Sequence, residues 1–165
     1  MKKFEINKKY VVEFCSSHIQ LQGKNGSFPA GVNGPYKDDD TPVRNTAHFL
    51  HLISNAYSFE NRSELKTSPF LALDYLLGIE SRPYGYTYHC RTKKNKDSCN
   101  GLIGQAWVIE SLLKAAEVFD LQECYDVSEK LFLLHPWDSN LSMWRRVDID
   151  GKILNFDQTF NHQLW

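Results

Sequence analysis

The chain has 165 residues and a formal net charge of −1, so its length suits one domain and its charge gives no reason to expect binding to nucleic acid or an anionic membrane. It contains no run of about 18 apolar residues, which argues against a transmembrane helix. The early lysines are not followed by the apolar stretch of a signal peptide, so we expect a cytoplasmic protein.

Four cysteines, Cys15, Cys90, Cys99 and Cys124, lie far apart and form no C-x-x-C pair, which favours free thiols over a disulfide framework or a zinc site. An alternative is that His89, Cys90 and Cys99 meet across one loop and hold zinc, as in a zinc-using cyclase of similar helical shape. Phosphate-loop, dinucleotide and serine-hydrolase motifs are absent from the sequence, so we expect no cofactor and no metal.

Apolar residues at helical spacing predict a first helix over residues 8–21. Glycines and prolines between residues 26 and 42 predict a long ordered loop without regular structure. A second helix is expected from Thr41 and Pro42 to about Tyr57, because threonine can cap a helix and proline suits its first turn. A third helix is expected to start after Asn61 or Ser63, with Ser63 or Ser68 as possible caps and Pro69 marking a kink or a late start, and to end at Gly78.

The longest helical pattern covers residues 100–120 and has a wide apolar stripe, which predicts a buried helix. Its start contains Gly101 and Gly104, so the backbone there can approach another group closely. A loop rich in aromatic and polar residues precedes it, which makes this helix a plausible wall of a ligand cavity.

A fifth helix is expected over residues 122–134, followed by a β-hairpin within residues 142–154 that turns at Asp150-Gly151, and by a sixth helix capped by Thr159. The fold class is therefore all-α, with three antiparallel helix pairs and a small β-hairpin in one domain. The long connections all precede the second helix of a pair, so we expect three loops to gather on one face. An irregular all-α bundle is the alternative.

Two kinds of acid–base residue recur at the starts of these second helices. Asp40 and Asp157 precede them and could act as acid and base, as in glycoside hydrolysis. His48 and His162 lie just inside them and could move a proton at carbon, as an epimerase or lyase requires. Each aspartate could instead cap a helix, and each histidine could be structural. The enzyme hypothesis predicts that all four side chains converge within about 10 Å.

Stacking aromatics beside hydrogen-bonding side chains suit a sugar or oligosaccharide, and arginines suit a carboxylate on it. Arg145 and Arg146 occupy opposite faces of a predicted strand, so at most one should enter the cavity. The predicted substrate-binding residues are Arg44, Asn45, Tyr86, Tyr88, His89, Asn100, Gln105, Trp144, Arg145, Asn161 and Trp165.

Three segments, NGLIGQAWVIESLLKAAEVFD, GVNGPYKDDDTPVRNTAH and WRRVDIDGKILNFDQTFNHQLW, resemble the pocket helix and cavity loops of the six-hairpin, (α/α)6-toroid carbohydrate-active proteins. These include unsaturated glucuronyl hydrolases and sugar 2-epimerases. The resemblance implies a sugar cavity at the N-terminal ends of the inner helices, and it does not choose between hydrolase, lyase and epimerase. A helical-repeat binding module without chemistry is a further alternative.

The resembling superfamily has six helix hairpins, whereas this sequence supplies about three. We therefore expect the N-terminal half of a longer protein, or a truncated product. The apolar side chains of Phe160, Leu164 and Trp165 would then lack a partner, and two copies could pair as a homodimer through these flanks.

Overall fold

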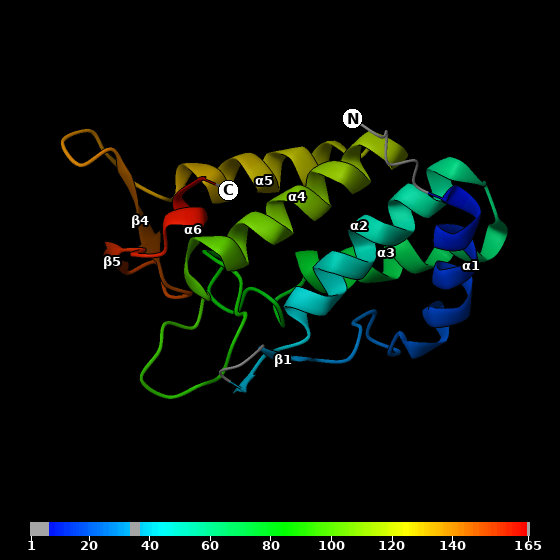
Figure 1. Cartoon of the computed structure of the whole chain (residues 1–165), viewed down its shortest axis with the longest axis horizontal. Coiled ribbons are helices and arrows are strands. Elements are labelled where there is room, and N and C mark those ends of the chain that lie inside the picture. Colours follow the sequence, from blue (N-terminus) through cyan, green and yellow to red (C-terminus); the bar gives the residue numbers. More distant parts are fainter. Residues whose placement is uncertain (1–6, 34–36, 165) are drawn as a thin grey trace.

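The computed structural model describes residues 7–33 and 37–164, and it is mostly helical, as predicted (Figure 1). The helices are α1 (Lys8–His18), followed by a short 3-10 turn (Ile19–Leu21), α2 (Val43–Phe59), α3 (Ser63–Leu77), α4 (Gly101–Phe119), α5 (Gln122–Leu133) and α6 (Phe160–Leu164). The strands are β1 (Val32–Asn33), β2 (Asp38–Asp39), β3 (Trp137–Asp138), β4 (Met143–Val147) and β5 (Ile153–Phe156). Within the described residues, no helix combines the length and hydropathy needed to cross a bilayer.

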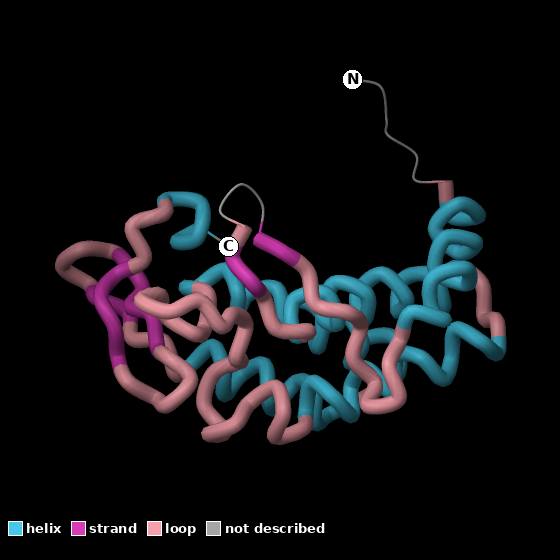
Figure 2. The backbone as a smooth tube through the Cα atoms, turned by 90° about the horizontal axis from the view of Figure 1, so that it is seen from below, coloured by secondary structure: helices cyan, strands magenta, loops and turns pink. Residues whose placement is uncertain are grey.

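Helices α2 and α4 pack side by side and run in the same direction, while α3 and α5 return antiparallel to them (Figure 1). Helix α3 packs on α2, and α5 packs on α4. The short α6 follows α5 and lies beside the start of α4. Helices α2, α4 and α6, which follow the long connections, therefore begin at the same end of the molecule. Figure 2 shows the loops and the three-stranded sheet that crowd this end.

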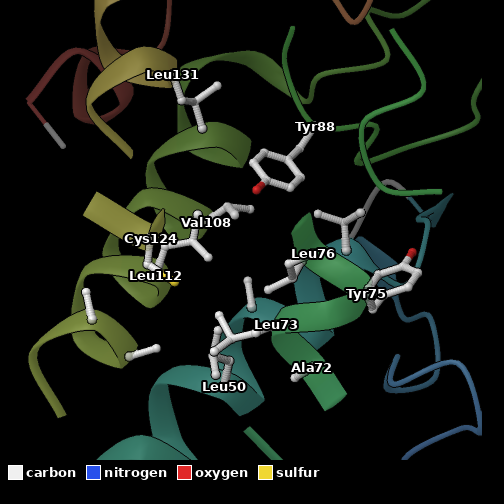
Figure 3. Close-up of a cluster of buried hydrophobic side chains, with 14 of the residues drawn as sticks. Leu50, Ala72, Leu73, Tyr75, Leu76, Tyr88, Val108, Leu112, Cys124 and Leu131 are labelled. Carbon is white, nitrogen blue, oxygen red and sulfur yellow. The ribbon is translucent and has the colours of Figure 1, made fainter. Parts of the chain in front are cut away.

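The main core lies between the two long helix pairs (Figure 3). Leu50 of α2, Leu76 of α3 and Leu112 of α4 are fully buried there, together with Leu131 of α5. Tyr88, from the loop before α4, fills the space between the pairs. Truncating a leucine in such a core lowers the free energy of unfolding by about 2–5 kcal/mol. Because the cluster includes Tyr88 of the preceding loop, it also holds α4 in place beside that loop.

The boundaries of α4 follow the predicted ones closely, because both flanking residues adopt a left-handed backbone that a helix cannot continue. Asn100 has φ 58° and Asp120 has φ 57°. The predicted caps of α3 are wrong, since Arg62 occupies the cap position and Ser68 lies inside the helix. The hydroxyl of Ser68 donates to Gln22, and Pro69 lies within the helix rather than at a late start. Gly78 ends α3, as predicted.

The prediction of a loop without regular structure over residues 26–42 is wrong in one detail. Two-residue strands pair there in antiparallel fashion, with Val32 opposite Asp39. The predicted β-hairpin is confirmed as β4 and β5, and Gly151 takes the left-handed turn position with φ 83°. Strand β3 adds a third member, pairing Trp137 with Trp144.

Candidate functional site

A polar cleft of about 600 Å³ lies where α4 and α6 begin. The loop before α4 forms one side of it, and the β4–β5 hairpin with the start of α6 forms the other. Its charged and polar lining comprises Arg91, Asn95, Lys96, Asp97, Asn100, Arg146, Asp148, Asp157, Thr159 and His162. The volume and the mixed lining are those of a small-molecule site.

Asp97 lines this cleft and pairs with an arginine from each of two elements. One carboxylate oxygen accepts from Arg91 and from Arg146, each at 2.7 Å, and the other accepts the Gly101 N–H at 2.8 Å. Burial raises the pKa of Asp97, but the Gly101 N–H, the Cys99 thiol and the two guanidinium groups outweigh it, so the pKa falls below its ordinary value. The carboxylate is therefore charged at neutral pH and joins the loop before α4 to strand β4.

Asp157 and His162 form a second carboxylate-centred group. Nδ1 of His162 lies 2.9 Å from Oδ2 of Asp157, and the same oxygen accepts the Leu102 N–H at 3.2 Å. Oδ1 accepts the Thr159 N–H at 3.1 Å, which fixes the turn just before α6; Thr159, the predicted cap, directly precedes the first residue of that helix. Burial raises the pKa of Asp157, but the hydrogen bonds from His162, Thr159 and Leu102 lower it further than burial raises it.

An ionised Asp157 fixes the tautomer of its partner. The proton between the two groups belongs on Nδ1 of His162, which leaves Nε2 as the free end of the ring. His162 borders both the polar cleft and an adjoining apolar hollow of about 470 Å³. A histidine held in this way by a carboxylate is the usual arrangement of a general base or acid.

Gly101 allows the two helices to approach each other this closely. Its φ is +64°, and a Cβ there would lie 2.4 Å from Oδ2 of Asp157. The predicted close approach at the glycine-rich start of α4 is thereby confirmed. The first two N–H groups of α4, those of Gly101 and Leu102, point at the carboxylates of Asp97 and Asp157. Negative charge at a helix N-terminus is stabilising, so both aspartates also have a structural role.

Gln163 holds the turn that carries His162. Its amide oxygen accepts the Trp144 N–H at 2.7 Å, and its Nε2 donates to the carbonyls of Trp144 and Asp157 at 3.1 and 2.9 Å. The two bonds to Trp144 fasten α6 to strand β4, and the bond to Asp157 closes the turn before α6. The short α6 therefore keeps its place through hydrogen bonds, since it buries no side chain fully.

The first loop presents its predicted residues differently. Asp40 is buried and pairs with Arg44, one turn into α2, at 2.7 Å. Asn45 donates to the Pro29 carbonyl at 2.7 Å. The ring of His48 lies 5.1 Å from that of Trp107 on α4, and burial, followed by the nearby Arg44, lowers its pKa.

The four predicted acid–base residues therefore make contacts in two groups. Asp157 and His162 are bonded to each other, whereas Asp40 and His48 engage Arg44 and Trp107. The two groups are joined through the backbone, because Asp40 forms a β-bridge with Arg91 of the cleft.

Several predicted binding residues serve the scaffold. Tyr88 lies in the core, and Gln105 is buried and binds the Tyr88 backbone and the Cys99 carbonyl. The His89 carbonyl accepts the Thr41 hydroxyl, which ties the start of α2 to this loop. Tyr86 packs against the hairpin turn beside Gly151, and Asn100 lines the cleft, where it accepts from Arg91 at 3.1 Å.

Of the residues predicted on the last loop, Trp144 lines a hollow, whereas Arg145 and Asn161 do not. Arg146 enters the polar cleft, whereas Arg145 stacks 4.6 Å over Phe156 and lies 3.4 Å from Asp138. The expected alternation is therefore confirmed, with Arg146 on the cleft side. Trp144 lines the apolar hollow, and Asn161 is exposed on α6. The prediction for Trp165 lies outside the described residues.

Asp97 is the functional candidate that sequence reasoning missed. It occupies the fourth position before Gly101, and an acid just ahead of a helix start is a recognisable capping signal. That signal does not predict the pairing of Asp97 with Arg91, 6 positions earlier, or with Arg146, 49 positions later.

The zinc alternative is not supported. Across residues 7–33 and 37–164 no group of three His, Cys, Asp or Glu side chains could hold a metal ion. All four cysteines are free and buried. Burial raises the pKa of Cys90 to about 12 and that of Cys15 to about 11, so these thiols are not ready nucleophiles at neutral pH.

Comparison with known proteins gives one strong likeness. No family profile matches the chain, and no solved structure matches it. A curated protein of the archaeon Haloferax volcanii, named archaeal glycosylation protein Q, is 47% identical over 147 residues. The matched part covers 89% of this chain and 40% of the relative, so the chain spans less than half the length of the protein it resembles.

Proposed function

We propose that this chain carries an acid–base site that moves a proton on a sugar substrate, with His162 as the catalytic residue and Asp157 as its positioning residue. The observation that carries the proposal is the 2.9 Å bond between Asp157 and Nδ1 of His162 at the border of a polar cleft. Sugar epimerases, isomerases and lyases all need such a group, because each removes a proton from carbon or oxygen and returns one elsewhere.

The proton transfer follows from this arrangement. Nε2 of His162 takes a proton from the substrate and becomes part of an imidazolium, whose charge the ionised Asp157 stabilises. The same nitrogen then returns the proton, either to another position or to the opposite face of the sugar. The low pKa of Asp157 keeps it charged throughout, so its part is orientation and electrostatic support.

The lining of the cleft supports a hydroxylated ligand. Asn100, Asp148 and Thr159 offer hydrogen-bonding groups beside His162. Arg91, Lys96 and Arg146 are balanced there by Asp97, Asp148 and Asp157, so the charge of the lining does not call for a strongly anionic substrate. The likeness to a protein named for glycosylation supports a role in carbohydrate processing.

Glycoside hydrolysis by Asp40 and Asp157 is the weaker candidate. Arg44 pairs with Asp40 at 2.7 Å, and the hydrogen bonds on Asp157 keep its pKa low, so neither group is suited to be the general acid that hydrolysis needs. The ionised Asp157 could still act as the base of such a reaction.

Deuterium incorporation tests the proposal directly. The protein is incubated in D₂O with neutral hexoses, N-acetylated hexosamines and uronic acids, and loss of each C–H signal is followed by ¹H NMR. We expect exchange at one carbon of one sugar class. His162→Gln should slow it by about 10³-fold and Asp157→Asn by about 10²-fold.

His18→Gln is the matched control, because Nδ1 of His18 also forms a hydrogen bond, at 2.8 Å to Phe14, but on α1 away from the cleft. This variant should keep full exchange. Release of reducing ends without deuterium uptake would favour the carboxylate hydrolase. Absence of both reactions, together with unchanged His162 ring signals in every sugar titration, would favour the non-catalytic binding module.

A further inference from the structure

The apolar hollow of about 470 Å³ adjoins the polar cleft, and His162 lines both. It is walled by α4 and by the last part of α5, next to the short α6 (Figure 1). Apolar side chains form most of this wall, and Trp144 of β4 adds an aromatic ring that packs on the ring of Phe132 at 5.2 Å. The proton transfer proposed above uses only His162 of this lining, so the rest of the hollow has no role in it.

The polar side chains of the hollow offer hydrogen-bond acceptors. Gln105 and Gln163 line it, but their amide groups already bind backbone groups of the scaffold. Glu110 is exposed beside them, and Nε2 of His162 is the free end of its ring. A carboxylate and an unprotonated ring nitrogen both accept hydrogen bonds, so a ligand here must bring donors.

His135 adds a buried acceptor to the same wall. Its Nδ1 lies 2.9 Å from the Leu131 carbonyl, so Nδ1 carries the proton and Nε2 is left as an acceptor. The residue is only 8% exposed, and Nε2 has no hydrogen-bond partner within the part of the chain that the structure describes. Buried polar groups are nearly always paired, so this unpaired acceptor in the wall of a hollow points to a donor on a ligand.

The charge of the hollow restricts that ligand. Among its described lining residues there is no arginine or lysine, and Glu110 is the only carboxylate. The polar cleft differs, since Arg91, Lys96 and Arg146 line it. A carboxylate entering the hollow would lose its hydration without gaining a cation, and Glu110 would repel it. The hollow therefore suits an uncharged ligand that carries hydroxyl groups.

Glu110 lies on the face of α4 that leads back to the cleft. Leu102, Ala106 and Glu110 follow one another at steps of four, so they share one face of the helix. Helical side chains lean toward the N-terminus, so we expect Glu110 to extend over the small Ala106 toward Leu102. His162 lies at that end, because its Nδ1 and the Leu102 N–H bind the same oxygen of Asp157.

We propose that the apolar hollow is a second sugar subsite, which binds an uncharged sugar unit next to the unit that reacts at His162. The apolar face of this second ring packs on Trp144, and its hydroxyl groups donate to Glu110 and His135. Because His162 lines both spaces, the two units are neighbours in one oligosaccharide. The inference rests on the proposed function, since it takes the ligand of the cleft to be a sugar.

An NMR titration of the 165-residue protein with labelled isoleucine methyl groups tests the inference. Ile109 lines the hollow, and Ile53, buried against α1, is the internal control. The probes are neutral disaccharides of glucose, galactose and mannose in α and β linkages, their monosaccharides, and the same disaccharides with either unit replaced by its uronic acid. At least one neutral disaccharide should shift the Ile109 methyl signal, with a Kd about tenfold below that of its monosaccharides. One of its two uronic forms should bind about tenfold more weakly, and the Ile53 signal should not move.

Glu110→Gln should weaken binding of that disaccharide about tenfold and reduce its advantage over the uronic form. Glu117→Gln is the matched control, because Glu117 lies on the same helix, pairs with Lys114 and does not line the hollow. It should leave both affinities unchanged. Equal effects of the two substitutions would overturn the inference.

His135→Asn removes the Nε2 acceptor and keeps a side-chain donor for the Leu131 carbonyl. It should weaken disaccharide binding about fivefold with little change in Tm. A lower Tm with an unchanged Kd would make His135 a structural residue and remove it from the subsite.

Deuterium exchange separates this inference from the proposed function. A shift of the Ile109 signal that depends on Glu110, without exchange at any carbon, would support the subsite and count against the proton transfer. Exchange without an Ile109 shift by any disaccharide would overturn the subsite alone, as would equal binding of the neutral and uronic forms. Absence of both signals would overturn both proposals.

Discussion

The starts of α2 and α6 look alike in sequence and differ in structure. Each has an aspartate shortly before the helix and a histidine inside it. Before α2, Asp40 forms an ion pair with Arg44, four residues further along the chain. His48 contacts the ring of Trp107 on the neighbouring α4. At α6 the aspartate reaches over the start of α4 and holds His162.

The difference shows when an aspartate before a helix pairs with the histidine inside that helix. An arginine at the fourth position takes the carboxylate of Asp40. Asp157 has no such arginine, since the fourth position after it is Asn161, and the glycine of a neighbouring helix lets it approach closely. The spacing of aspartate and histidine in the sequence does not by itself distinguish Asp40 and His48 from Asp157 and His162.

The sharpest way to break the α6 arrangement is Gly101→Ala. The new Cβ would lie 2.4 Å from Oδ2 of Asp157 and would also require a left-handed backbone. We expect a loss of about 3 kcal/mol in the free energy of unfolding, measured by urea denaturation, together with a displaced His162 ring signal. Gly85→Ala is the control, because Gly85 has φ +74° and no atom near its Cβ position, so it should cost only about 1 kcal/mol. Equal losses would show that Asp157 does not crowd Gly101.

Asp97→Asn should have the next largest effect. It leaves the guanidinium groups of Arg91 and Arg146 without their shared carboxylate in a partly buried place. The expected loss is about 2 kcal/mol, seen as a lower urea midpoint with an unchanged slope. The exposed pair of Arg62 and Glu60 offers a comparison, and Glu60→Gln should leave the midpoint unchanged. An equal change in midpoint for both substitutions would show that the ion pairs of Asp97 with Arg91 and Arg146 do not stabilise the fold.

Acid should weaken the α4–α6 region. The pKa values of Asp97 and Asp157 are lowered in the folded protein, so their stabilisation is present above the ordinary aspartate value of about 3.9 and is lost as the pH falls through the lower folded values. We expect the free energy of unfolding to drop between pH 5 and the acid limit of folding. The drop should be smaller in Asp97→Asn, and parallel curves for the two proteins would contradict the assignment.

The smallest effect concerns the thiols. Burial raises the pKa of Cys124 to about 11 and that of Cys90 to about 12, so neither should react with a thiol reagent at pH 8 while the protein is folded. All four thiols should react in urea. Rapid labelling of Cys90 in the folded protein would show that the loop before α4 opens easily.

The sequence predicts the elements of this fold better than the partners of its side chains. The extent of α4 and the turn at Gly151 follow from local signals, namely helical periodicity and a glycine after aspartate. The caps of α3 were not predictable in this way, because Ser68 is drawn to Gln22, 46 residues away. Asp97 and Arg146 are likewise 49 residues apart, and they meet only because strand β4 lies beside the loop before α4 in the folded protein.

One consequence follows from the two carboxylates that cap α4. Asp97 lies four positions before Gly101, but Asp157 lies 55 positions beyond Leu102, after α5 and the β-hairpin in the chain. The first turn of α4 is therefore only half stabilised until the C-terminal part has docked. Fraying of that turn and release of the His162 ring should occur as a single cooperative opening, so the cleft exists either complete or not at all.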